Sequence, residues 1–205
     1  MTTLFTPIQL GDLRLPNRIF MAPLTRSRGT EDHLPQADLM AKYYRQRATA
    51  GLILSEALPV APMAVGYARV PGIWSPAQVE AWKPVTDAVH SENGTIFAQL
   101  WHVGRISHSR FLQGRLPVAP SAIQPAGHLS LVRPITPFEI PRALSLGEVK
   151  QIPELFQLAA RHAGRRDLMA WSYTARTATC WINSYRVLQT RDLMNMAAAL
   201  KTGLD

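Results

Sequence analysis

The sequence predicts an α/β fold, because short apolar runs alternate with helical patterns over most of the chain. Three runs, at residues 18–22, 51–56 and 94–100, are each apolar and bounded by turn residues, as buried strands are. Between them, residues 37–50 and 75–92 place apolar side chains at helical spacing. Strands that are apolar on both faces and alternate with helices are typical of a parallel sheet covered by helices.

Turn-forming residues mark the ends of the first elements. Residues 4–15 are expected to form a short hairpin with Gly11 and Asp12 at its turn, because these residue types tolerate the backbone of tight turns. Pro23 ends the first strand, since proline cannot donate to a sheet ladder. Gly51 follows the first helical pattern and is expected to end it.

Two serines are expected to begin helices. Ser75 suits the N-cap position, and Pro76 suits the first helical position, where its missing N–H costs nothing. Ser145 is followed three residues later by Glu148, which is the spacing of a capping box. A further helix is therefore expected to run from this point through Ala159.

A long stretch punctuated by Pro and Gly, residues 104–142, separates the third strand from this last helix. Connections of that length in compact α/β proteins usually serve as lids or binding loops. Beyond residue 164 the pattern changes, because residues 165–202 contain neither Gly nor Pro. Residues 170–190 have neither a period of 2 nor one of 3.6, so the fourth strand that is due there is not predicted.

Composition narrows the classes of function. The chain has 205 residues, a formal net charge of +8 and a single cysteine, Cys180, which excludes a disulfide framework and a thiolate-rich metal site. Cys180 lies among residues that match no nucleophile motif, and the six histidines show no metal-ligand spacing, so no metal is predicted. The arginines are scattered rather than clustered, which favours a generally basic surface over a nucleic-acid partner.

Membrane and export signals are not predicted. No apolar run reaches the roughly 18 residues that a membrane span requires. Residues 1–7 lack the basic start and apolar segment of a secretory signal. We therefore expect a cytoplasmic protein with no membrane partner.

Six motifs occur in an order and at a spacing that resemble one protein family. They are Met21–Arg26 (MAPLTR), Tyr43–Arg47 (YYRQR), Ser55–Ala57 (SEA), Pro71–Trp74 (PGIW), Phe97–Arg105 (FAQLWHVGR) and Val118–Ala122 (VAPSA). Together they resemble the old yellow enzyme family, which consists of FMN-dependent NAD(P)H oxidoreductases, or ene-reductases, similar to N-ethylmaleimide reductase. The resemblance runs from about Leu4 to Ala163. One such motif would be a weak signal, but six in family order are a strong one.

The resemblance implies a (β/α)8 TIM barrel, of which residues 1–163 would be the N-terminal part, with FMN at the carboxyl ends of the strands. The residues that it assigns to FMN are Pro23, Leu24, Thr25, Ala57 and Gln99. The backbone of the first three would line the isoalloxazine, and the Thr25 hydroxyl would donate to the flavin. Ala57 would contact the ring, and the Gln99 amide would offer a donor and an acceptor to the pyrimidine edge. Trp101 would shape the substrate side.

The implied activity is the reduction of a small activated alkene or nitro compound, with FMN as cofactor and NAD(P)H as reductant. The physiological substrate, the choice between NADH and NADPH, and the oligomeric state stay open. Without the resemblance, each residue has a simpler interpretation. Thr25 would be a helix cap, Gln99 an amide bonded to backbone, and Trp101 and His102 core residues.

Residues 164–205 depart from the family pattern, and we interpret them as an out-of-frame tail. The family's fourth strand carries a segment like GFDGVELHGANGY, whose His and Asn hold the substrate oxygen and whose Tyr donates the proton. None of these catalytic residues is intact in the chain. Read from the third base of each codon, synonymous codons for 166–179 can spell that segment, and those for 194–202 can spell EYGGSIENR. We therefore expect a frameshift near residues 163–165.

The expected product is an incomplete barrel made of the first three βα units. Three of eight strands cannot close a barrel, so open edges and a tendency to aggregate are expected. Loss of the proton donor and of the phosphate site on the family's last loops predicts little or no activity. The alternative is a non-enzymatic fragment that binds flavin weakly or pairs with a complementary chain. A basic RNA-associated domain is a third interpretation, which the scattered charge disfavours.

Overall fold

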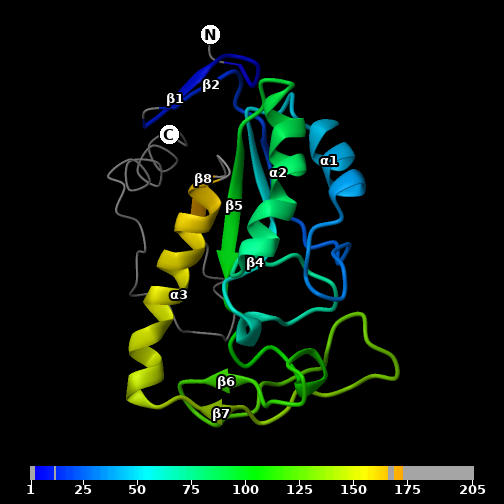
Figure 1. The fold of residues 1–205 in the computed structure, drawn as a ribbon, viewed down its shortest axis with the longest axis vertical. Helices are drawn as coiled ribbons and strands as arrows, with labels where there is room; N and C mark the ends of the chain where they lie inside the picture. The colour runs from blue at the N-terminus through cyan, green and yellow to red at the C-terminus, as the bar shows by residue number, and fades with distance from the viewer. Residues whose placement is uncertain (1–2, 12, 166–168, 173–205) are drawn as a thin grey trace.

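The computed structural model of the chain describes residues 3–11, 13–165 and 169–172. Its centre is a parallel sheet with the strand order β3–β4–β5–β8 (Figure 1). The strands are β3 (Phe20–Met21), β4 (Leu52–Pro59), β5 (Ile96–Trp101) and β8 (Met169–Ser172). The predicted α/β class and parallel strands are confirmed, and the described residues form an open sheet rather than a closed barrel.

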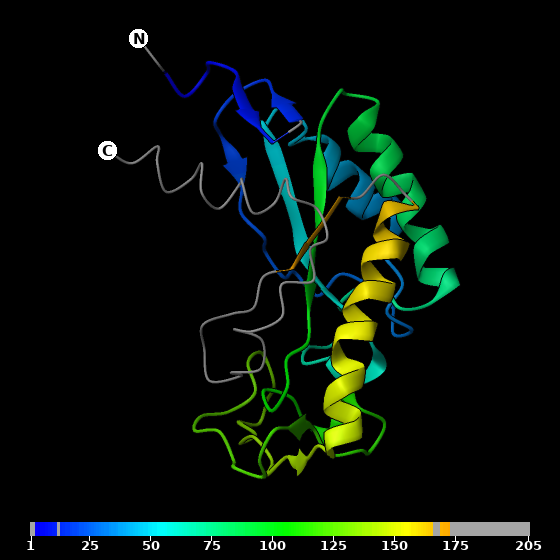
Figure 2. The ribbon, with the colours of Figure 1, turned by 90° about the vertical axis from the view of Figure 1, so that its left-hand side faces the viewer.

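Three helices connect these strands and lie on one side of the sheet (Figure 2). They are α1 (Ala37–Arg45), α2 (Pro76–His90) and α3 (Leu146–Gly164). One apolar cluster fills the layer between sheet and helices, with Trp82 of α2 fully buried at its centre. The Trp82 indole N–H donates to the carbonyl oxygen of Gly72 at 3.1 Å, which satisfies the one polar atom of that side chain. Among the helices that the structure describes, none has the length and apolar character that a membrane span requires.

Both serines begin helices as predicted. Ser75 accepts a hydrogen bond from the N–H of Gln78 and starts α2. Ser145 accepts from the N–H of Glu148, and the Glu148 carboxylate accepts from the N–H of Ser145, so the predicted capping box is confirmed. The Arg142 guanidinium, together with these bonds to Ser145, lowers the pKa of Glu148 to about 2. The first turn of α3 therefore carries a charged cap at neutral pH.

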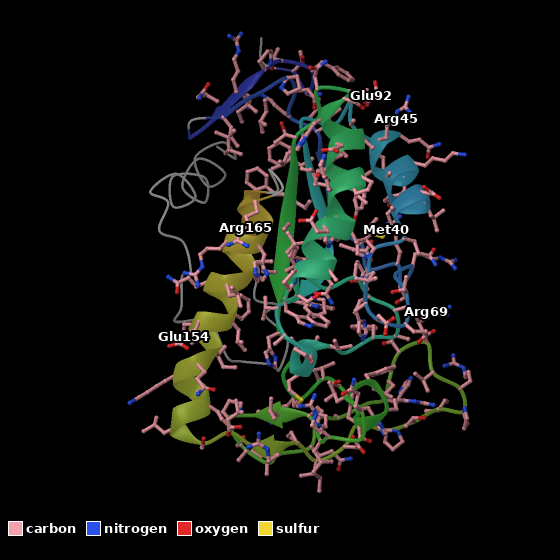
Figure 3. All side chains as sticks on the ribbon, viewed as in Figure 1. Met40, Arg45, Arg69, Glu92, Glu154 and Arg165 are labelled. Carbon is pink, nitrogen blue, oxygen red and sulfur yellow. The ribbon has the colours of Figure 1, made fainter. Side chains whose placement is uncertain are left out.

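Helix α1 ends at Arg45, earlier than the predicted end at residue 50. Beyond Arg45 the chain tightens into turns, because the N–H groups of Arg47, Ala48 and Ala50 each bond to the carbonyl three residues back. An exposed ion pair lies at the end of the helix. The Nε atom of Arg45 lies 2.8 Å from Oε1 of Glu92, which follows α2, and the two side chains meet across the two helices (Figure 3).

The predicted N-terminal hairpin is confirmed and covers the amino end of the sheet. It consists of β1 (Ile8–Leu10) and β2 (Leu13–Leu15), paired antiparallel. Its turn uses Gly11 with φ 57°, a conformation that glycine adopts readily. Leucines of the hairpin, Leu10 and Leu15, pack with Leu52 of β4 and Phe97 of β5. Because apolar packing covers the amino ends of the strands, a ligand site is expected at their carboxyl ends.

The long stretch between β5 and α3 lies beyond the carboxyl ends of the strands (Figure 1). It contains a 3₁₀ turn (Ser109–Phe111) and two short strands, β6 (Val118–Ala119) and β7 (Arg142–Ala143), which pair in parallel. Arg105 fastens it at two points, donating to the carbonyl of Ile123 at 2.9 Å and to the hydroxyl of Ser121 at 3.2 Å. The long connection that the sequence predicts is therefore held by these hydrogen bonds beyond the carboxyl ends of the strands, where a binding loop is expected.

The expectation that no fourth strand forms is wrong. Residues 169–172 form β8, which pairs in parallel with β5 from Phe97↔Met169 to Leu100↔Ser172. The prediction failed because it relied on side-chain periodicity. The free edge of β5 offers a row of unpaired backbone N–H and C=O groups, and pairing with them requires only an extended backbone that returns after α3. The rest of the proposed tail, residues 166–168 and 173–205, lies outside the described residues.

Candidate functional site

The predicted flavin residues come together at the carboxyl edge of the sheet. Strands β3, β4 and β5 run in parallel, so their carboxyl ends lie at the same edge. Residues 23–25 follow β3 after one intervening residue, whereas Ala57 and Gln99 lie in the second halves of β4 and β5. This edge is where parallel α/β proteins place their ligands.

A bulge in β4 aligns two of the predicted residues. Leu54 pairs with Phe97 and Ala57 pairs with Gln99, so β4 contains one residue more than β5 between these two pairs. The hydroxyl of Ser55, inside the bulge, accepts a hydrogen bond from the N–H of Gln99 at 3.1 Å. It also donates to the carbonyl of Glu56 at 2.7 Å. The bulge thus makes Ala57 and Gln99 direct neighbours across the two strands.

The polar side chains predicted to bind the flavin have no hydrogen-bond partner within the described part of the chain. Thr25 is exposed and Gln99 is half-buried, and neither side chain hydrogen-bonds to another described residue. Leu24 is 55% exposed, whereas Ala57 is 3% exposed. A free hydroxyl, a free amide and a small buried residue fit the polar edge and the flat face of an isoalloxazine. The described residues fit the ring of FMN.

Trp101, predicted to shape the substrate side, ends β5 and stacks on Tyr67. The ring centroids are 5.7 Å apart and the planes are inclined by 10°. The indole nitrogen of Trp101 is buried and has no hydrogen-bond partner among the described residues, an arrangement that leaves a donor available to a ligand. Tyr67 was missed by the sequence reasoning because it lies in a loop between motifs and shows no periodic signal.

His102 follows Trp101 and is held in one tautomer. The N–H of Gly104 donates to Nδ1 of His102 at 3.0 Å, so the proton of the neutral imidazole lies on Nε2. Burial lowers the pKa of His102 to about 4, which keeps the ring neutral at physiological pH. The simpler interpretation of His102 as a satisfied packing residue therefore fits its geometry. Across the described residues, no three His, Cys, Asp or Glu side chains gather where they could hold a metal ion.

A second group that the sequence reasoning missed is the pair Arg26 and Glu56. Each is adjacent in sequence to a predicted flavin residue, Thr25 or Ala57, and both stand in the quoted motifs. Their side chains meet at 2.9 Å on the helix side of the sheet. The pairing could not be read from the sequence because it joins residues on two different strands.

Comparison with known proteins shows the family to which the chain belongs. The family model described as "NADH:flavin oxidoreductase / NADH oxidase family" matches residues 3–166. The flavin oxidoreductase hxnT of Emericella nidulans is 42% identical over 165 residues, which cover 78% of this chain and 42% of that protein. The 12-oxophytodienoate reductase 1 of Oryza sativa subsp. japonica is 41% identical over 168 residues, covering 78% of this chain and 41% of that protein.

Solved structures agree with this assignment. The old yellow enzyme homologue from Zymomonas mobilis superposes with a TM-score of 0.77 at 49% identity, covering 81% of this chain and 46% of that chain. Morphinone reductase gives a TM-score of 0.77 at 46% identity, covering 83% of this chain and 47% of that chain. The chain therefore spans less than half the length of these relatives. Over residues 3–166 it belongs to the NADH:flavin oxidoreductase / NADH oxidase family, the family of old yellow enzyme.

Proposed function

We propose that residues 1–163 are the opening half of an FMN-dependent NAD(P)H oxidoreductase of the ene-reductase type, and that residues 164–205 are an out-of-frame tail. The family binds FMN and uses NAD(P)H. The observation that carries the proposal is the pairing of Ala57 with Gln99 at the carboxyl edge of the sheet, the edge at which the loop that bears Thr25 leaves β3. On this proposal the chain presents part of a flavin pocket and has little or no activity by itself.

Each residue of the pocket has a definite role in the proposal. FMN, when bound, supplies hydride chemistry that no side chain can provide. The Thr25 hydroxyl donates to the ring and the Gln99 amide holds its pyrimidine edge, while residues 23–24 and Ala57 contact its flat face. Trp101 shapes the side on which a small activated alkene or nitro compound would bind. The His, Asn and Tyr that hold and protonate the substrate in the family are missing from the sequence.

The second candidate function is that of a non-enzymatic fragment that binds flavin weakly or pairs with a complementary chain. The open sheet favours it, because β3 and β8 each have a neighbour on one side only within the described residues. The two functions differ in what NADPH does. A working oxidoreductase would bleach bound flavin, whereas a passive fragment would not.

Titration of the purified chain with FMN, followed by absorbance and flavin fluorescence, tests the proposal. We expect weak, substoichiometric binding and no bleaching by NADPH, because the described residues hold the ring but not the phosphate. Gln99→Leu is expected to weaken this binding about tenfold, the effect of losing one or two hydrogen bonds. The matched control is Gln157→Leu on the exposed side of α3, which should bind as the unaltered chain does.

Two outcomes would contradict the proposal. Equal loss of affinity in Gln99→Leu and Gln157→Leu would show that flavin binds elsewhere. A stoichiometric yellow complex that NADPH bleaches would show that the missing segments are not needed.

A further inference from the structure

An ion pair lies directly behind the flavin-facing edge, on the helix side of β4. Nη2 of Arg26 is 2.9 Å from Oε1 of Glu56. The Glu56 side chain is fully buried and that of Arg26 is 20% exposed. The other carboxylate oxygen of Glu56 and the Nε of Arg26 are buried and have no partner among the described residues. Burial raises the pKa of Glu56, and the Arg26 guanidinium opposes that rise.

Two tyrosines of α1, Tyr43 and Tyr44, contact this ion pair. The Arg26 guanidinium carbon lies 3.3 Å from the centroid of the Tyr43 ring, and that of Arg47 lies 3.7 Å from the same centroid. Two guanidinium groups cannot share one face of a ring at these distances, so Tyr43 is held between them. Tyr44 is fully buried, and its hydroxyl oxygen accepts a hydrogen bond from the N–H of Glu56 at 2.8 Å.

The pair links the two segments that bear flavin contacts. Arg26 is the residue after Thr25, in the loop that leaves β3. Glu56 is the residue before Ala57, inside the bulge that brings Ala57 opposite Gln99. The β3–β4 ladder itself is short, with only Phe20↔Leu52 and Met21↔Ile53 in register. Beyond that ladder, the ion pair is the polar contact within the described residues that holds the loop to the strand.

We propose that the Arg26–Glu56 ion pair, seated on Tyr43 and Tyr44, is a positioning device that fixes Thr25 relative to Ala57 and Gln99. The inference rests on the proposed function, because this relative placement matters only if the three residues address one flavin. Arg26 is suited to the task, since its planar guanidinium can stack on a ring and donate to a carboxylate at the same time. Neither residue touches the flavin side, so their role is to position rather than to catalyse.

A nitroxide label at position 25 measures this positioning directly. Thr25→Cys in a Cys180→Ser background provides one labelling site, and Gln157→Cys on α3 in the same background provides a reference site. Electron paramagnetic resonance line shapes are then compared for Arg26→Met, for Glu56→Gln and for the control Arg28→Met, which alters an exposed arginine of the same loop. We expect the label at position 25 to tumble several-fold faster in the first two variants, with no change in the control or at position 157.

Two outcomes of the label experiment would overturn the inference. An unchanged label at position 25 would show that the pair does not order the loop. Faster motion at both label sites would show that the pair supports the fold as a whole rather than the site. The FMN titration separates the two proposals, because Arg26→Met should weaken flavin binding about tenfold while Arg28→Met leaves it unchanged. Ordered labels without any flavin binding would leave the positioning device standing and remove the proposed function.

Discussion

A gene with one base inserted near codons 163–165, whose restored frame is read on past codon 205 through the family's later strands, is expected to produce a yellow protein that oxidises NADPH in the presence of an activated alkene. Insertion of one base makes each later triplet begin at the third base of a present codon, so codons 166–179 would read GFDGVELHGANGY. This change restores the proton donor, and general acid catalysis alone contributes about 10²–10⁴-fold. We expect turnover at least about 10³-fold above that of the present chain, measured as NADPH oxidation with an activated alkene.

Two controls make the frame experiment decisive. Insertion of two bases at the same place gives the third reading frame and should produce a protein without flavin. Replacement of the restored Tyr by Phe should keep the yellow colour and lower turnover, because flavin binding does not need the proton donor. A colourless protein from the one-base insertion would contradict the frameshift account.

Gly51→Ala is expected to destabilise the fold strongly. A Cβ at Gly51 would overlap the carbonyl oxygen of Asn17 and lie 2.9 Å from its carbonyl carbon. The backbone cannot easily shift, because the N–H of Gly51 donates both to the carbonyl of Ile19 and to Oδ1 of Asn17, at 2.8 Å each. We expect a loss of about 3 kcal/mol or more in the free energy of unfolding, measured by urea denaturation.

The matched control for this change is Gly147→Ala in the first turn of α3. A Cβ there would have Ser145 Oγ as its nearest neighbour at 3.9 Å, which is ordinary contact. Alanine should stabilise the helix by up to about 1 kcal/mol. Equal unfolding midpoints for the two variants would show that the junction of Gly51 with Asn17 is not part of the folded chain.

Local signals explain which elements could be predicted from the sequence. The caps at Ser75 and Ser145 were predictable because the donor and acceptor lie within three residues of each other. The apolar runs of β4 and β5 were predictable because both faces of these strands are buried. The position of α1 was predictable, but its end was not. After Arg45 the backbone bonds to the carbonyl three residues back, and no residue type in the sequence marks this change.

The interactions that could not be predicted all depend on tertiary contact. The bulge at Ser55 shows only in the register of β4 against β5. Arg26 and Glu56 lie 30 positions apart in the sequence, and nothing in either motif predicts that their side chains pair. Strand β8 has no strand pattern and forms on the free edge of β5. For the candidate site, motif resemblance predicted residues that lie at the carboxyl edge, whereas Tyr67 and the ion pair required the structure.

The third bases of three codons test the central claim most directly. Under the frameshift account, the codon for Tyr173 ends in C, that for Arg176 ends in A, and that for Ala178 ends in T, because these bases start the triplets for His, Asn and Tyr. The protein sequence restricts the Tyr173 base to C or T and leaves the other two bases open, so it does not by itself decide any of the three. Nucleotide sequencing is expected to find C, A and T. Other bases at these positions would contradict the claim that the chain is a flavin barrel read out of frame after its first half.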